Sequence, residues 1–166
     1  MFKVGDTVKY GGNGICKITD IITRDFCGEA TEYYVLQTVT GFDSIIYVPV
    51  NNELLCNKMQ YLLSKEDAKK VIKDIPKGNI DWIEDVKKRT ERFNSLLASH
   101  DRRDILGVIG LIYSKKLELQ SIGKKLRVSD EHILNVGERA IFEELSVVLG
   151  IAKNDIPNFI KNIINE

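Results

Sequence analysis

The alternation of apolar and polar residues in the first fifty positions constrains this chain most. Residues 2–10 alternate, and a glycine-rich break follows at 11–14. Three further segments rich in β-branched and aromatic residues come at short intervals, at 15–23, 32–39 and 44–50. Alternate side chains of a strand lie on opposite faces, and glycine adopts the positive φ of tight turns without steric cost. The sequence therefore predicts a small meandering β barrel, which can offer a strand edge or a face to a partner.

Helical patterns fill the rest of the chain. Ser64 is a good N-cap for a first helix, Pro76 ends that helix, and Gly150 is a favourable left-handed C-cap further on. Later helices are expected over residues 82–98 (capped by Asp81), 102–119, 129–149 (capped by Ser129) and 156–164. Gly107 and Gly110 each disfavour a helix by about 1 kcal/mol relative to alanine, and they would permit close packing.

These patterns predict an α+β protein with a domain boundary at the linker 76–81. The expected division is a β-barrel domain at 1–63, a helix and linker at 64–80, and a helical domain at 81–166. No internal repeat or low-complexity tract interrupts this order.

Charge and cysteine content narrow the class of protein. The formal net charge is zero, but residues 82–127 hold 11 Lys/Arg against 6 Asp/Glu, and residues 128–166 hold 3 against 7. The middle of the chain is thus basic and the end acidic. Three cysteines without a C-x-x-C pair predict neither a disulfide framework nor a metal site, and free thiols suit a reducing cytoplasm. No long apolar run predicts a membrane span.

The residues of the first domain resemble a known family. The opening FKVGDTVKY, Gly14, Gly28-Glu29, the EYYVL segment at 32–36 and Val48-Pro49 are similar to the CarD/CdnL family of bacterial transcription regulators and to the polymerase-interacting domain of transcription-repair coupling factor. Trp82 and the late Glu144-Leu145 extend the resemblance over the chain. It implies a Tudor-like barrel that binds the β subunit of RNA polymerase, and a helical domain that contacts promoter DNA at the upstream edge of the melted bubble.

The strand around residues 44–48 is the predicted docking edge. An open edge offers main-chain donors and acceptors to an added strand. The predicted polymerase-binding residues are Arg24, Ile46, Tyr47, Val48 and Pro49. Some relatives have arginine where this chain has Tyr47. The alternative is that the strand is internal and Tyr47 only packs.

Trp82 and the basic residues near it form the predicted DNA-binding site. A large ring at the start of a helix can wedge into a partly unstacked base step, and cations can position the protein on phosphates without reading sequence. The predicted DNA-binding residues are Trp82, Lys87, Lys88, Arg89, Arg92, Lys124 and Lys125. Lys124 and Lys125 belong to a second basic zone around the turn before the helix at 129–149, together with Lys115, Lys116 and Arg127.

Structural alternatives stand beside each part of this site. Trp82 could pack into the bundle, the second zone could be a solvated loop, and local pairs could form between Glu84 and Lys88 and between Asp85 and Arg89. Glu84 and Asp85 also stand where the family often has arginines.

The resulting hypothesis is a non-enzymatic transcription regulator that binds RNA polymerase and promoter DNA, stabilises the open complex, and resides in the cytoplasm with the nucleoid. The main alternative is an adaptor on the polymerase that never touches DNA. No Ser/His/Asp set, Walker loop or metal-ligand spacing predicts catalysis, a cofactor or a metal. The sequence leaves the oligomeric state, the promoters and the sign of regulation open.

Overall fold

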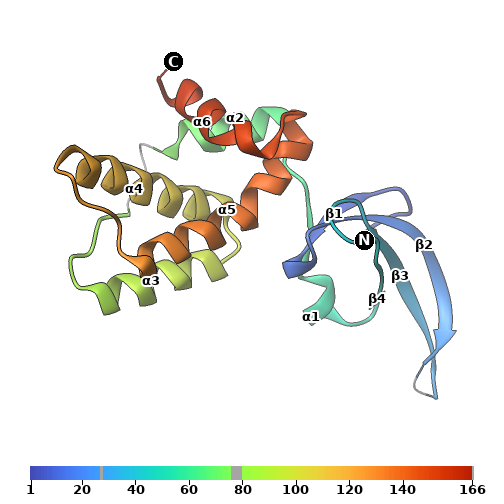
Figure 1. Ribbon diagram of the computed structural model, residues 1–166. Helices are drawn as coiled ribbons and strands as arrows, with labels where there is room; N and C mark the ends of the chain where they lie inside the picture. Colours follow the sequence, from blue (N-terminus) through green and yellow to red (C-terminus); the bar gives the residue numbers. More distant parts are fainter. Residues whose placement is uncertain (27, 76–79, 166) are drawn as a thin grey trace. The chain divides into compact units, whose positions relative to one another are not determined.

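The computed structural model describes residues 1–26, 28–75 and 80–165, and these form two compact units (Figure 1). The first unit spans Met1–Leu63 and the second spans Ser64–Glu166. Part of the predicted linker, residues 76–79, lies outside the described residues.

The first unit is a five-stranded antiparallel sheet in the order β4-β3-β2-β1-β5. Its elements are β1 (Thr7–Tyr10), the 3-10 turn η1 (Gly11–Asn13), β2 (Ile15–Asp25), β3 (Ala30–Thr38), β4 (Ile45–Pro49), the short helix α1 (Glu53–Cys56) and β5 (Met59–Tyr61). The β2–β3 register shifts between Ile18 and Asp20, as at a β-bulge. The sequence missed β5, because a three-residue strand is too short for alternation to be read.

One face of this sheet carries the core of the unit. The buried cluster consists of Val8, Tyr10, Cys16, Ile18, Tyr34, Leu36, Val48 and Met59, with Phe2 and Ile46 packed against it. The ring of Phe2 meets Tyr34 edge-on, with centroids 6.0 Å apart. These residues come from alternate positions of their strands, as the period of two predicts.

The second unit is helical. Its elements are α2 (Lys65–Lys73), α3 (Val86–Ala98), α4 (Arg102–Ser121), α5 (Val128–Leu149), the 3-10 turn η3 (Lys153–Asp155) and α6 (Ile156–Asn165). In Figure 1 α3, α4 and α5 lie against one another, and α2 packs against α6, α5 and α4. The structure thus includes α2 in the helical unit, ahead of the predicted linker.

The helix ends match the sequence at some positions and correct it at others. The Ser64 side chain accepts a hydrogen bond from the Asp67 N–H, and Gly150 ends α5 with φ 69° and ψ 34°. The predicted helix start at Trp82 is wrong: α3 begins at Val86, because the Asp85 carboxylate caps it by accepting from the Lys88 N–H at 2.9 Å. Trp82 therefore lies in the irregular segment before the helix.

The two glycines of α4 permit close packing, as predicted, and the groups that pack against them are isoleucine side chains. A Cβ added at Gly107 would lie 2.8 Å from Ile80 Cδ1, and one at Gly110 would lie 2.8 Å from Ile75 Cγ2. Ile75 and Ile80, which flank residues 76–79 in the sequence, therefore pack against α4.

Candidate functional site

Strand β4 forms an open edge of the sheet, because among the strands that the structure describes it pairs with β3 alone. Thr38 N donates to Ser44 O at 3.0 Å and Val50 N donates to Glu32 O at 2.9 Å. In an antiparallel ladder such hydrogen-bonded pairs alternate with pairs whose main-chain groups point away from each other. The main-chain groups of Ile45 and Tyr47 consequently face the open edge.

The predicted polymerase-binding residues of β4 lie on two opposite faces of the sheet. Val48 is 0% exposed and belongs to the core cluster, so its side chain is used inside the sheet unit and its assignment to polymerase binding stays a prediction. Ile46 is half-buried against the same core. Tyr47 is 44% exposed on the opposite face, beside Pro49. Arg24 lies on β2, which β3 separates from the edge strand, so the structure does not bring it to the edge.

Three aromatic rings gather on the exposed face, and we call Phe26, Tyr33 and Tyr47 the aromatic trio. The Phe26 ring lies 5.1 Å from that of Tyr33 and 5.4 Å from that of Tyr47, and the two tyrosine rings are 6.5 Å apart, all edge-to-face. The sequence analysis missed Phe26 and Tyr33 as partners of Tyr47. Strand parity could have found Tyr33, whereas Phe26 lies beyond the end of β2 and has no such signal.

Trp82 lies half-buried at the surface of the helical unit between aromatic and cationic groups. Its ring meets Phe93 edge-to-face at 6.1 Å. The Arg89 guanidinium carbon lies 4.3 Å from the ring centroid and Lys115 Nζ lies 5.5 Å from it. A cation over an indole contributes about 0.5–2 kcal/mol, depending on its desolvation. The ring is therefore held in place while part of it remains exposed.

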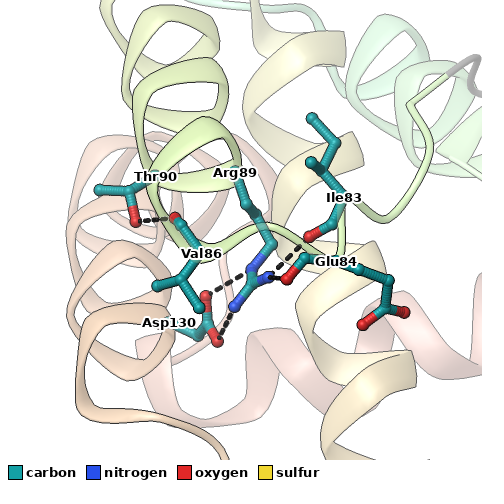
Figure 2. Close-up of polar contacts among 6 residues, drawn as sticks. All are labelled: Ile83, Glu84, Val86, Arg89, Thr90 and Asp130. Carbon is teal, nitrogen blue, oxygen red and sulfur yellow. Dashed lines mark hydrogen bonds and ion pairs between the residues drawn. The ribbon is translucent and has the colours of Figure 1, made fainter.

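Arg89 does not fit its predicted role as a phosphate ligand. It is 2% exposed, and its Nε and Nη2 donate to the two carboxylate oxygens of Asp130 at 2.9 Å each. Figure 2 shows the guanidinium between Asp130 and the carbonyls of Ile83 and Glu84, which accept from Nη1 at 2.6 and 3.2 Å. Four of the five donor N–H groups of an arginine are thus used inside the fold. Arg89 joins α3 to α5, and the local pair with Asp85 is not formed because Asp85 caps α3.

The remaining predicted cations are exposed. Lys87, Lys88 and Arg92 lie on the outer side of α3, and Lys124 and Lys125 lie in the turn between α4 and α5. In Figure 1 that turn and the segment before α3 lie at the same end of the helical unit, where α4 finishes. The position of Lys115 over Trp82 brings the two predicted basic zones together.

Within residues 1–26, 28–75 and 80–165, no group of three or more His, Cys, Asp or Glu side chains could hold a metal ion. Cys16 and Cys56 are thiols rather than halves of a disulfide, and burial raises the pKa of the Cys56 thiol, which favours its protonated form. Cys27 lies outside the described residues. No helix in the described part of the chain is long and apolar enough to cross a bilayer.

Comparison with known protein families bears on the sheet unit. Residues 2–60 match the family model described as CarD-like/TRCF RID domain, an RNA polymerase-interacting domain. The match coincides with the sheet unit and confirms its resemblance to the CarD-like polymerase-interacting domains. It supports an RNA polymerase-interacting transcription factor, and the helical unit lies outside it.

Proposed function

We propose that this protein binds the β subunit of bacterial RNA polymerase by adding a strand to the open edge of β4, and stabilises the promoter open complex through its helical unit. The observation that carries the first half is the family match over residues 2–60, together with the edge position of β4. Main-chain pairing supplies affinity with little demand on side-chain identity. This explains why a docking strand can bury Val48 in its own core and still bind.

A proline at position 45 tests strand addition directly. The Ile45 N–H faces the open edge, so Ile45→Pro deletes a donor to the partner and leaves the ladder with β3 complete. We expect Ile45→Pro to weaken binding to purified bacterial RNA polymerase at least tenfold. The matched control Ile45→Val keeps the N–H and should bind as the parent does. Equal binding of both variants in biolayer interferometry would exclude pairing at β4.

The second half of the proposal rests on Trp82 and the exposed cations near it. Lys88 and Arg92 are four residues apart and share one side of α3. With the turn lysines Lys124 and Lys125 they can bind phosphates, while the held indole supports the end of a base stack at the edge of melted DNA. Polymerase placement would then supply promoter specificity, since none of these contacts reads a base edge.

Two observations favour the adaptor alternative. Arg89 is buried in the helical unit, and Glu84 and Asp85 are exposed acids close to Trp82 in the sequence. Binding of the full chain to a forked DNA duplex separates the two functions. Salt-dependent binding that Trp82→Ala weakens supports open-complex stabilisation, whereas polymerase binding without any binding to forked DNA favours the adaptor.

A further inference from the structure

We infer that the strand that docks on β4 is uncharged and aliphatic where it faces the aromatic trio, so that the interface is apolar rather than ionic. This inference rests on the proposed docking at β4 and specifies the chemistry of the partner.

The exposed face of β3 and β4 carries no charged side chain along their paired length. The register pairs Tyr33 with Pro49, Val35 with Tyr47, and Gln37 with Ile45. These six side chains share one face, because the intervening residues Tyr34, Leu36 and Val48 are in the core. Val35 is only 9% exposed although it lies on this outer face, in register with Tyr47.

The apolar surface extends to the open edge itself. Ile45 is 61% exposed and Phe26 is 56% exposed, and Phe26 packs on Tyr47. An added strand pairs with the outward main-chain groups of Ile45 and Tyr47, so its residue opposite Tyr47 would point to the same face. That residue would pack against the trio, and aromatic side chains of this kind are enriched at the centres of protein interfaces.

The charged side chains of β2 that share this face are Lys17, Asp20 and Arg24, and β3 separates all three from the open edge of β4. Asp20 pairs with Val35, which pairs with Tyr47, so Asp20 lies three strand spacings from the added strand, or about 14 Å. The Asp43 carboxylate lies nearer, at the Ile45 end of the face, where it already accepts a hydrogen bond from Gln37 Nε2 at 3.0 Å. The separation from Asp20 exceeds the screening length of about 8 Å at physiological ionic strength. A charge packed against the aromatic trio would be desolvated, whereas an aliphatic side chain would gain burial.

The experiment measures binding of the full chain to purified bacterial RNA polymerase at 50 and 300 mM NaCl, with the charge at position 47 varied. We expect the Kd to change less than threefold with salt. Both Tyr47→Arg and Tyr47→Glu should weaken binding at least tenfold. Leu54→Ala, at an exposed apolar residue of α1, is the matched control and should bind as the parent does. Tighter binding by either charged variant, or a loss of more than tenfold with salt, would establish an ionic partner and overturn the inference.

A second arm decides the inference even if the chain does not bind polymerase, a result that would overturn the proposed function alone. Seven-residue peptides that alternate threonine with valine, glutamate or lysine are titrated into the ¹⁵N-labelled full chain. The valine peptide should shift the amide signals of Ile45 and Tyr47 most. A larger shift with the glutamate or lysine peptide, or no shift with any of them, contradicts an apolar docking strand.

Discussion

Removing the Arg89 guanidinium should destabilise the helical unit strongly, because it would break a buried ion pair from one side. Arg89→Ala leaves the Asp130 carboxylate, itself 2% exposed, without either of its two charged donors. It also leaves the carbonyls of Ile83 and Glu84 without this donor. Breaking a buried pair in this way costs about 3–5 kcal/mol. For a domain of about 100 residues this corresponds to a fall in Tm of about 12 °C or more.

The lone tryptophan makes the measurement specific to this unit. Trp82 is the only tryptophan of the chain and lies under the Arg89 guanidinium, so urea unfolding followed by its fluorescence reports the helical unit. Arg92→Ala, on the exposed side of the same helix, should change the free energy of unfolding by no more than about 0.5 kcal/mol.

A double-mutant cycle separates the ion pair from other effects of truncation. Arg89→Met combined with Asp130→Leu should be more stable than either single variant, because it leaves no buried charge unpaired. The reasoning is refuted if Arg89→Ala costs less than about 1 kcal/mol, or if the two single effects simply add.

Three further predictions concern Trp82, the exposed cations and α4. Trp82→Ala should leave polymerase binding unchanged and shorten the open-complex lifetime about tenfold. This change corresponds to a loss of about 1.4 kcal/mol of stacking on the indole. An unchanged lifetime in a promoter-dissociation assay rejects the role of Trp82 as a wedge at the edge of the melted DNA. If about three phosphates are neutralised, log affinity for forked DNA should fall with log salt at a slope of about −2.7, and Arg92→Ala should reduce that slope by about 0.9. Gly110→Ala should lower the free energy of unfolding by about 1 kcal/mol, because the new Cβ would lie 2.8 Å from Ile75 Cγ2. The cost of this overpacking exceeds the gain in helix propensity. When Ile75→Ala is present in the same chain, Gly110→Ala should be neutral or stabilising in urea denaturation.

Local patterns predicted most elements of this fold because their causes are local. The alternation of residues 2–50 follows from the two faces of a strand, and the caps at Ser64 and Gly150 depend on a few neighbouring residues. The start of α3 was wrong because two aspartates, Asp81 and Asp85, both precede a helical pattern. The choice between them depends on where the chain enters the bundle.

The candidate site was harder to predict because its decisive contacts are distant in sequence. Arg89 and Asp130 are 41 positions apart, and nothing near Arg89 distinguishes it from the exposed Lys88 or Arg92 except helical phase. The phase does place Arg89 on the same side of α3 as the buried Phe93. The alternation of strand residues gives a similar indication that Val48 is buried, because it places Val48 on the same face as Tyr34 and on the face opposite to Tyr47. The period of the helix and of the strand would therefore have indicated that the side chains of Arg89 and Val48 are buried.

The charged surface near Trp82 and the apolar face at β4 should respond differently to salt. A slope of −2.7 reduces DNA affinity about 40-fold between 50 and 200 mM salt. An apolar interface at β4 has no comparable release of counterions, so its affinity should stay nearly constant over the same range. As salt rises, the protein should therefore remain on the polymerase after its effect on open-complex lifetime has disappeared. Parallel loss of polymerase binding and of the lifetime effect would mean that both surfaces are ionic, which contradicts the uncharged face formed by Tyr33, Val35 and Tyr47.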